Sequence, residues 1–321
     1  MLLRTWSQSA RNAGGSTIEP AHVVGATVID GSVRDRSDVD ITIENGRITQ
    51  LGTSSVHGER LDAEGLTMTP GLIDAHVRLG QSSPNQPHFS LQISAAEIAA
   101  DIFATVGAAL DVGFTTVRDT GGIDGGVVTA IAKGKVRGPR FLSCGPVQCQ
   151  IGGHGCYEAD SVMAGNADEL RHNVREAFRR GASFLQLEQL LYETAGAGLA
   201  ESARDRAKGA REQMTEALAV AKQAGVRIGL GSDLIGPAPD RRGRELSLRA
   251  ALETPMEALV GGDADQRRDP RPLRPGGCHR ARRAGRPRPL ERQPLEDPEL
   301  FSDPAKAVLV IRAGQIVKDL R

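Results

Sequence analysis

The stretch Thr69-Pro70-Gly71-Leu72-Ile73-Asp74-Ala75-His76-Val77-Arg78 decides how the rest of this 321-residue chain is interpreted. Its apolar run predicts a buried strand that ends in polar residues, with a histidine two positions before an arginine. Histidine can ligate a metal ion, whereas the guanidinium of Arg78 stays protonated and has no lone pair to give. A metal site built on this strand would therefore receive a ligand from His76 but none from Arg78.

Composition excludes several classes of protein. Lys+Arg and Asp+Glu both number 40, so the net charge is zero, and the pI of about 7.1 predicts no nucleic-acid partner. Hydrophobic residues make up 39% of the chain and mean hydropathy is −0.28, which is typical of a soluble protein. The chain contains no run of 18 apolar residues, so no membrane span is expected. Residues 1–19 lack the apolar core of a secretory signal, so we expect a cytoplasmic protein.

The cysteine pattern favours thiols over a metal cluster. The four cysteines form no Cys-x-x-Cys pair, although three of them lie within 13 residues. A structural zinc site needs closer pairing than this. The cysteines are Cys144, Cys149, Cys156 and Cys278.

Both ends of the chain predict short β-strands. Residues 23–31, 39–43 and 48–52 are rich in β-branched residues, and Asn45-Gly46 predicts a hairpin turn between the second and third. Residues 307–317 repeat this strand–turn–strand pattern. Segments 20–68 and 293–321 are therefore expected to combine into one small β-sandwich, preceded by an N-terminal extension over residues 1–19.

The middle of the chain alternates between strands and helices, which predicts a parallel sheet or barrel. Expected helices cover 94–112, 168–180 and 203–224, and expected strands cover 114–119, 140–145, 183–187 and 226–233. In a barrel of this kind the chemistry lies at the C-terminal ends of the strands. His76, Asp119 and Asp233 occupy such ends.

Residues 261–292 differ from both regions, because they hold ten arginines and five prolines in 32 residues. The prolines and paired glycines disfavour a long helix or a central strand, so the stretch is expected to be a disordered basic linker. A nucleic-acid arm is an alternative, but no aromatic residues are present to stack on bases. A frameshift between residues 260 and 293 is a further hypothesis that the nucleotide sequence would test.

Several segments together resemble the metal-dependent amidohydrolase superfamily, in its imidazolonepropionase-like, Xaa-Pro dipeptidase branch. They occur in the order of that family and span about two-thirds of the chain. The matching segments are 46–48, 69–76, 113–119, 138–140, 152–155, 181–185, 224–233, 254–259 and the C-terminal β pair.

The resemblance implies an α/β fold: a (β/α)8 barrel over residues 69–260 beside a β-sandwich made from both chain ends. It implies hydrolysis of an amide, peptide or cyclic amide C–N bond in a small-molecule substrate. It also implies a divalent metal, with zinc as the expected ion, that lowers the pKa of a bound water. A strand-end aspartate takes the proton of that water and later delivers it to the leaving nitrogen.

Individual positions keep or depart from the family pattern. His76 matches the first metal-binding histidine, and Asp233 matches the aspartate that is both metal ligand and general acid/base. Arg78 stands at the second histidine position, where it is either a neutral substitution or a group for a substrate carboxylate. Gln186 stands at the position of a lysine that is carboxylated to bridge two metals. His154 matches a pocket loop, with substrate contact and loop ordering as alternatives.

About 100 family residues that follow the fourth strand are missing, together with two strands that each carry a histidine ligand. No histidine occurs between His172 and His279. The barrel is therefore expected to lack about two strand–helix units, which would leave open edges that invite aggregation or homo-oligomer formation. Two hypotheses remain: a hydrolase of the family, or a catalytically inactive relative with a binding or assembly role.

Overall fold

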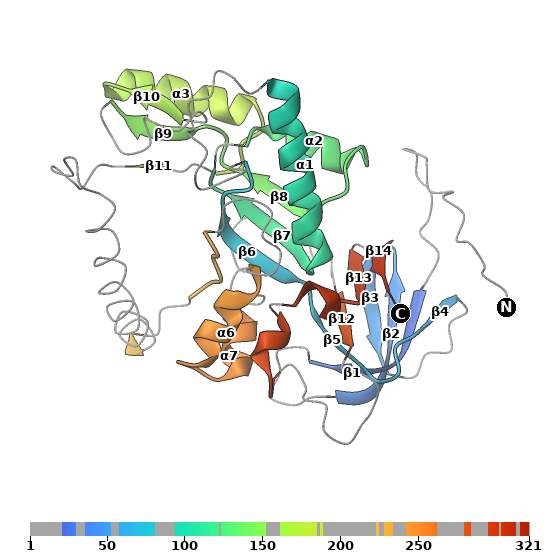
Figure 1. Ribbon diagram of the computed structural model, residues 1–321. Coiled ribbons are helices and arrows are strands. Elements are labelled where there is room, and N and C mark those ends of the chain that lie inside the picture. Colours follow the sequence, from blue (N-terminus) through green and yellow to red (C-terminus); the bar gives the residue numbers. More distant parts are fainter. Residues whose placement is uncertain are drawn as a thin grey trace.

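A computed structural model describes residues 21–29, 36–52, 58–80, 94–121, 123–151, 161–184, 187–188, 223–224, 228–233, 242–261, 279–283, 295–301, 303–312 and 315–320. Two main β regions, a further small sheet and a set of helices make up this part of the chain (Figure 1). Among the described residues, no helix is long and apolar enough to cross a membrane.

Strands from both ends of the chain form one eight-stranded sheet. Its order is β14-β13-β12-β5-β1-β2-β3, and β4 pairs with β1 beside this path. The N-terminal members are β1 Ala21–Val28, β2 Arg36–Glu44, β3 Arg47–Leu51, β4 Glu59–Asp62 and β5 Leu66–Pro70. The C-terminal members are β12 His279–Arg283, β13 Leu309–Arg312 and β14 Gln315–Asp319.

The hairpin predicted at Asn45-Gly46 is confirmed. β2 and β3 pair antiparallel around it, with Glu44 opposite Arg47. Asn45 and Gly46 both have positive φ, 51° and 75°, which is the conformation that a two-residue hairpin turn requires. An apolar cluster that includes Val23, Ile41 and Met68 lies on this sheet and reaches Ile311 near the C-terminus.

β12 lies inside the stretch 261–292, which was expected to lack regular structure, and for residues 279–283 the structure differs from that expectation. β12 pairs antiparallel with β5 on one side and with β13 on the other, and thereby joins the N-terminal and C-terminal strands. Backbone pairing explains the difference, because ladder hydrogen bonds do not depend on apolar side chains. No proline falls within His279–Arg283, so every residue there has an N–H group.

A parallel three-stranded sheet forms the second region, with the order β6-β7-β8. Its strands are β6 Leu72–Val77, β7 Phe114–Asp119 and β8 Arg140–Ser143. Backbone bonds extend it at both edges: Ala75 N donates to Leu230 O at 2.9 Å, and Ser183 N donates to Ser143 O at 2.7 Å. Residues 228–233 thus lie beside β6, and this described part of the strand expected over 226–233 is not a regular strand.

Helices predicted from apolar periodicity are present close to the expected bounds. α1 covers Ala95–Asp111 and α3 covers Ala167–Arg179, and the side chains of Ser94 and Asn166 cap their first turns. The remaining elements are α2 Gly125–Ala132, α6 Arg244–Ala250, α7 Pro255–Gly261 and the 3-10 turns Pro298–Phe301 and Pro304–Lys306. A small sheet of order β10-β9-β11 contains β9 Val147–Gln150, β10 Ser161–Ala164 and β11 Leu187–Glu188. The helix expected over 203–224 lies almost entirely outside the described residues.

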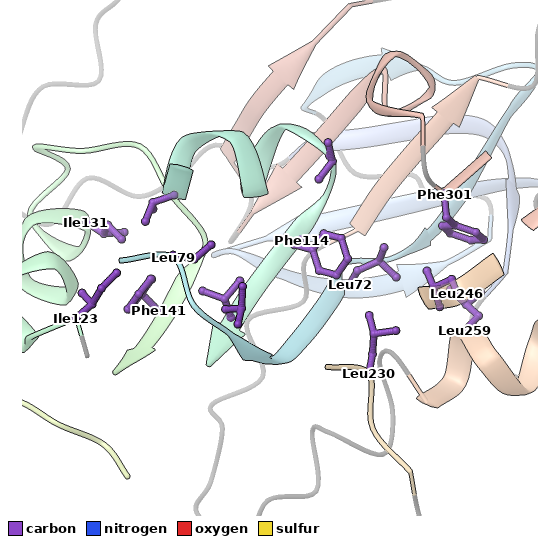
Figure 2. Close-up of a cluster of buried hydrophobic side chains, with 14 of the residues drawn as sticks. Leu72, Leu79, Phe114, Ile123, Ile131, Phe141, Leu230, Leu246, Leu259 and Phe301 are labelled. Carbon is purple, nitrogen blue, oxygen red and sulfur yellow. The ribbon is translucent and has the colours of Figure 1, made fainter. Parts of the chain in front are cut away.

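One apolar core unites the parallel sheet with the helices on both sides of it. Figure 2 shows Leu72 of β6 beside Phe114 of β7, with Leu230 on one side and Leu246, Leu259 and Phe301 beyond. Leu72, Phe114 and Leu230 have no exposed surface. Removing this much apolar surface from water is the main stabilising contribution to the region, and it places residues 228–233 beside β6.

Polar contacts tie the two β regions together at the C-terminal end of α1. Lys318 Nζ of β14 donates to the carbonyl of Asp111 at 2.9 Å. Arg137 Nε donates to the carbonyl of Val317 at 3.2 Å, and its guanidinium forms an ion pair with Asp111. A cation near the last carbonyls of a helix is favourable because of the helix dipole.

Candidate functional site

The strand-end site consists of His76, Arg78 and Asp233. His76 is near the end of β6 and Arg78 follows that strand, whereas Asp233 ends the neighbouring segment 228–233. His76 Nε2 lies 3.3 Å from Asp233 Oδ1, and Arg78 Nε donates to the same oxygen at 3.0 Å. The structure therefore brings together the two predicted ligands and the residue that departs from the family pattern, and all three meet at one carboxylate oxygen.

Backbone hydrogen bonds hold Asp233 at this position. Its N–H donates to the carbonyl of His76 at 2.8 Å, and its φ of 47° places it in the left-handed region. Aspartate tolerates that region better than most residues. Gly231, two residues earlier, lies so close to β6 that an added Cβ would be 2.9 Å from His76 Cβ. The close approach of the two backbones thus requires glycine at position 231.

The surroundings of Asp233 favour its ionised form. The hydrogen bond from His76 has the largest effect on the pKa of this carboxyl, and together with the charge of Arg78 it lowers the pKa below its usual value, against an opposing effect of burial that is second in size. The side chain is 61% exposed, so water also solvates the charge. A general base works best when its pKa is near the working pH, and lowering the pKa of Asp233 moves it away from that range.

A fully buried acidic residue, Asp74, lies beneath the strand-end site. Its Oδ1 accepts from Ser232 N at 3.1 Å and from His76 N at 3.3 Å, and its Oδ2 accepts from Ser232 Oγ at 2.6 Å. Arg242 Nη1 lies 3.4 Å from Oδ2, and neither charged side chain has exposed surface. Asp74 therefore links β6 to Ser232, the residue before Asp233.

Burial raises the pKa of Asp74, and the charge of Arg242 and the bonds from Ser232 and His76 offset part of that rise. Burial also lowers the pKa of Arg242. Neither residue was predicted from the sequence. Asp74 had a visible signal, as the one charged residue inside the apolar strand 72–77, whereas nothing local distinguishes Arg242 among the neighbouring arginines.

Glu245 of α6 supports the same segment from the other side. Its Oε2 accepts a hydrogen bond from Gly231 N at 3.0 Å. Burial, and next the charge of Asp74, raise the pKa of Glu245 to about 7. Nearby, Arg249 and Glu253 form a largely buried ion pair at 2.7 Å. The residues before Asp233 are thus held by two acidic side chains, Asp74 and Glu245, that sequence reasoning missed.

Asp119, at the end of β7, has a structural role. Its Oδ2 accepts from Leu79 N at 2.8 Å, and its Oδ1 accepts from Gly121 N at 3.1 Å and Ile123 N at 3.3 Å. The residue has no exposed surface. These bonds organise the loop after β6 and the loop after β7, which positions Arg78 beside Gly121.

The donor groups at this site do not fit a metal ion. Within the described residues, no group of three or more His, Cys, Asp or Glu side chains has a metal-binding arrangement. His76 and Asp233 supply two donors, and catalytic zinc sites use three protein ligands. The cationic Arg78 contacts Asp233 Oδ1, where a cationic metal would bind. His154 and Gln186 lie outside the described residues, and of the four cysteines Cys144 and Cys149 are described, both buried.

Comparison with known proteins identifies the fold just described. Residues 67–197 match the Amidohydrolase family. The chain carries an amidohydrolase-family domain over these residues. The matched residues include β6, His76, Arg78 and the whole β6-β7-β8 sheet. The expectation drawn from the motifs is therefore confirmed for the superfamily and branch.

Curated relatives match the chain over short stretches. An imidazolonepropionase from Brevibacillus brevis is 34% identical over 104 residues, which cover 29% of this chain and 23% of that protein. A dihydroorotase from Geobacter metallireducens is 45% identical over 60 residues, covering 18% of this chain and 14% of that protein. The match thus spans less than a quarter of the length of these relatives.

Solved structures resemble the chain over nearly its whole length. A prolidase complexed with N-methylphosphonate-L-proline superimposes with a TM-score of 0.78 at 20% identity, covering 94% of this chain and 100% of that chain. The ochratoxinase of A. niger gives 0.79 at 18% identity, covering 95% and 96%. These likenesses establish a mixed α/β fold of the amidohydrolase type.

Proposed function

We propose that this amidohydrolase is a catalytically impaired relative of metal-dependent C–N hydrolases. In the ancestral reaction, a metal-activated water attacked an amide, peptide or cyclic amide bond of a small-molecule substrate, and Asp233 served as general acid/base. In the present chain, Arg78 and Gln186 replace two ligands, and the histidines of the missing strands are absent. The protein would then keep a binding or assembly role in place of hydrolysis.

The contact between Arg78 and Asp233 carries this proposal. A general base needs a lone pair that is available to a water proton, and Asp233 Oδ1 already accepts from Arg78 and lies beside His76 Nε2. Both neighbours also lower the pKa of Asp233, which weakens it as a base. The remaining donors are too few to hold zinc firmly and lower the pKa of a bound water.

Retained hydrolysis is the second candidate, and one observation favours it. Asp233 is ionised, 61% exposed and adjacent to His76, so the general acid/base and the first metal ligand of the ancestral reaction still lie together at the strand ends. The substrate would be an amide or a dipeptide. The proposed fold for both candidates is a (β/α)8 barrel that lacks about two strand–helix units, beside a β-sandwich built from both chain ends. A barrel that lacks these units would have open sheet edges, which also favour a homo-oligomer.

The test is hydrolysis by the full-length protein of Xaa-Pro dipeptides, N-acyl amino acids and cyclic amides, with and without added zinc. We expect no turnover above that of a matched Asp233→Asn variant. Zinc-stimulated turnover that is lost in both Asp233→Asn and His76→Ala would overturn the proposal and establish the hydrolase. The Asn variant is a fair control because it keeps the size and the backbone hydrogen bond of residue 233.

A further inference from the structure

The side chain of Arg78 is directed toward Asp233. Side chains two residues apart on a strand point to the same face, so His76 and Arg78 approach the carboxylate from the same side of β6. The Arg78 side chain is only 16% exposed, whereas Asp233 is 61% exposed. The arginine stem is therefore packed within the protein, and its charged end is directed at one carboxylate oxygen.

A glycine in the loop after β7 makes room for this arginine. A Cβ added to Gly121 would lie 2.9 Å from both Cα and Cβ of Arg78. Backbone atoms cannot move aside as a flexible side chain can, so the loop after β7 approaches Arg78 closely only because residue 121 is glycine. Asp119 fixes the same loop through its bond to Gly121 N at 3.1 Å. The position of Arg78 is thus determined from two sides.

Arg78 gives the carboxylate of Asp233 a positive partner at this place. Its backbone is fixed by the bond to His76 O, and the fully buried Asp74 is bonded to the preceding residue, Ser232. Two acidic side chains are consequently held close to the same end of β6. Arg242 pairs with Asp74 in the interior, and Arg78 pairs with Asp233 at the surface. Each acidic group has its own arginine.

We propose that the guanidinium of Arg78 is a tethered cation that takes over the structural task of a bound metal ion. It neutralises Asp233 and ties residues 228–233 to β6, so the strand ends assemble without any metal. The inference rests on the proposed function in one respect, namely that Asp233 stands at a former metal-ligand position. It goes further in assigning a present role to Arg78 and in making metal independence a property of the folded chain.

The experiment compares wild type with Arg78→His, Arg78→Gln and Arg78→Lys, all as full-length protein stripped with a chelator. Zinc content is measured by elemental analysis after equilibration with zinc and dialysis. Cobalt binding is followed by its visible absorption, and thermal midpoints are recorded with and without zinc. Arg78→Gln removes the charge without adding a ligand, Arg78→Lys keeps a cation, and Arg78→His adds an imidazole beside His76.

We expect wild type and Arg78→Lys to retain no zinc and to melt at the same midpoint with and without it. Arg78→Gln should melt a few degrees lower, because Asp233 loses its cation, and zinc should not restore it. Arg78→His should also melt lower when stripped, but zinc should raise its midpoint again, because a ligand that binds only the folded state stabilises it. Its zinc affinity should exceed that of wild type by roughly tenfold or more, and adding His76→Ala should abolish the gain.

Three results would each overturn the inference. The first is binding of about one zinc per wild-type chain, with that zinc lost in His76→Ala. The second is an unchanged thermal midpoint in Arg78→Gln. The third is no gain of zinc or cobalt binding in Arg78→His. If Arg78→Gln is insoluble, the zinc measurements on wild type, Arg78→Lys and Arg78→His still decide. Metal-independent hydrolysis by wild type would refute the proposed function alone, whereas zinc binding by wild type would refute the tethered cation.

Discussion

Asp74 and Arg242 form an ion pair in which neither side chain has any exposed surface, with 3.4 Å between Arg242 Nη1 and Asp74 Oδ2. The two residues are 168 positions apart in the sequence. Asp74 also accepts from Ser232 and His76, so the pair joins β6, the segment before Asp233 and the residue that precedes α6 by two positions. The charged pair lies directly beneath the strand-end site.

Removing Arg242 alone should be severe. Arg242→Leu leaves Asp74 buried without its cation, which typically costs about 3–5 kcal/mol of unfolding free energy. The double variant Asp74→Asn, Arg242→Leu should recover much of that loss, because the neutral amide still bonds to Ser232. Chemical denaturation of both single variants and the double variant gives the coupling energy. Additive losses would contradict a direct interaction between Asp74 and Arg242.

Glu245 should make stability fall as the pH rises toward neutrality. Its folded-state pKa of about 7 lies above its usual 4.5, so between these values the folded state binds more protons than the unfolded state. The folded state is therefore favoured below pH 4.5, loses stability between pH 4.5 and 7, and gains none above. The difference corresponds to on the order of 3 kcal/mol.

Glu245→Gln should flatten this dependence. Glutamine keeps an oxygen that can accept from Gly231 N, but it carries no proton equilibrium. Its thermal midpoint should therefore exceed that of wild type at pH 8 and approach it at pH 5. Glu245→Ala separates the two effects, because it removes the charge and the hydrogen bond together. Parallel midpoint curves for wild type and Glu245→Gln from pH 5 to 8 would contradict the assignment.

Gly121 should be intolerant of a methyl group. Gly121→Ala places a Cβ 2.9 Å from the backbone of Arg78, and relieving that contact should cost about 1–3 kcal/mol and displace Arg78 from Asp233. Gly107 in α1 is the matched control, because a Cβ there has only a carbonyl oxygen at 3.9 Å. Gly107→Ala should stabilise the helix by about 0.5–1 kcal/mol. Equal effects of the two substitutions on the thermal midpoint would argue against the close approach.

β12 should prove essential to the large sheet despite its basic sequence. Ala281 is in register with Met68 of β5 and Leu309 of β13. Ala281→Pro removes an N–H group from a central strand and should destabilise the sheet by about 2 kcal/mol or more. Ala281→Ser is the control, since it keeps the N–H. The measurement is the denaturation midpoint together with the rate of limited proteolysis. A proline variant as stable and as resistant as the serine variant would mean that β12 contributes little.

Local sequence patterns were sufficient to predict the elements whose hydrogen bonds join residues close together in the chain. The Asn45-Gly46 hairpin follows from turn chemistry and α1 from apolar periodicity, both of which act over a few residues along the chain. β12 could not be predicted this way, because its hydrogen-bond partners in β5 and β13 are distant in sequence. Its own side chains give no strand signal.

The sequence by itself determined the family, the strand that carries His76, the substitution at Arg78 and the aspartate at position 233. These are properties of residue identity, because an arginine lacks a metal-ligating lone pair wherever it lies. Only the tertiary structure decided that Arg78 and His76 meet one oxygen of Asp233, that Asp74 and Arg242 pair beneath them, and that Glu245 bonds to Gly231. The physical reason is that charge pairing and burial depend on distances that only the packed core around β6 sets, and for the contacts of Arg78 and Arg242 the two segments are more than 150 residues apart.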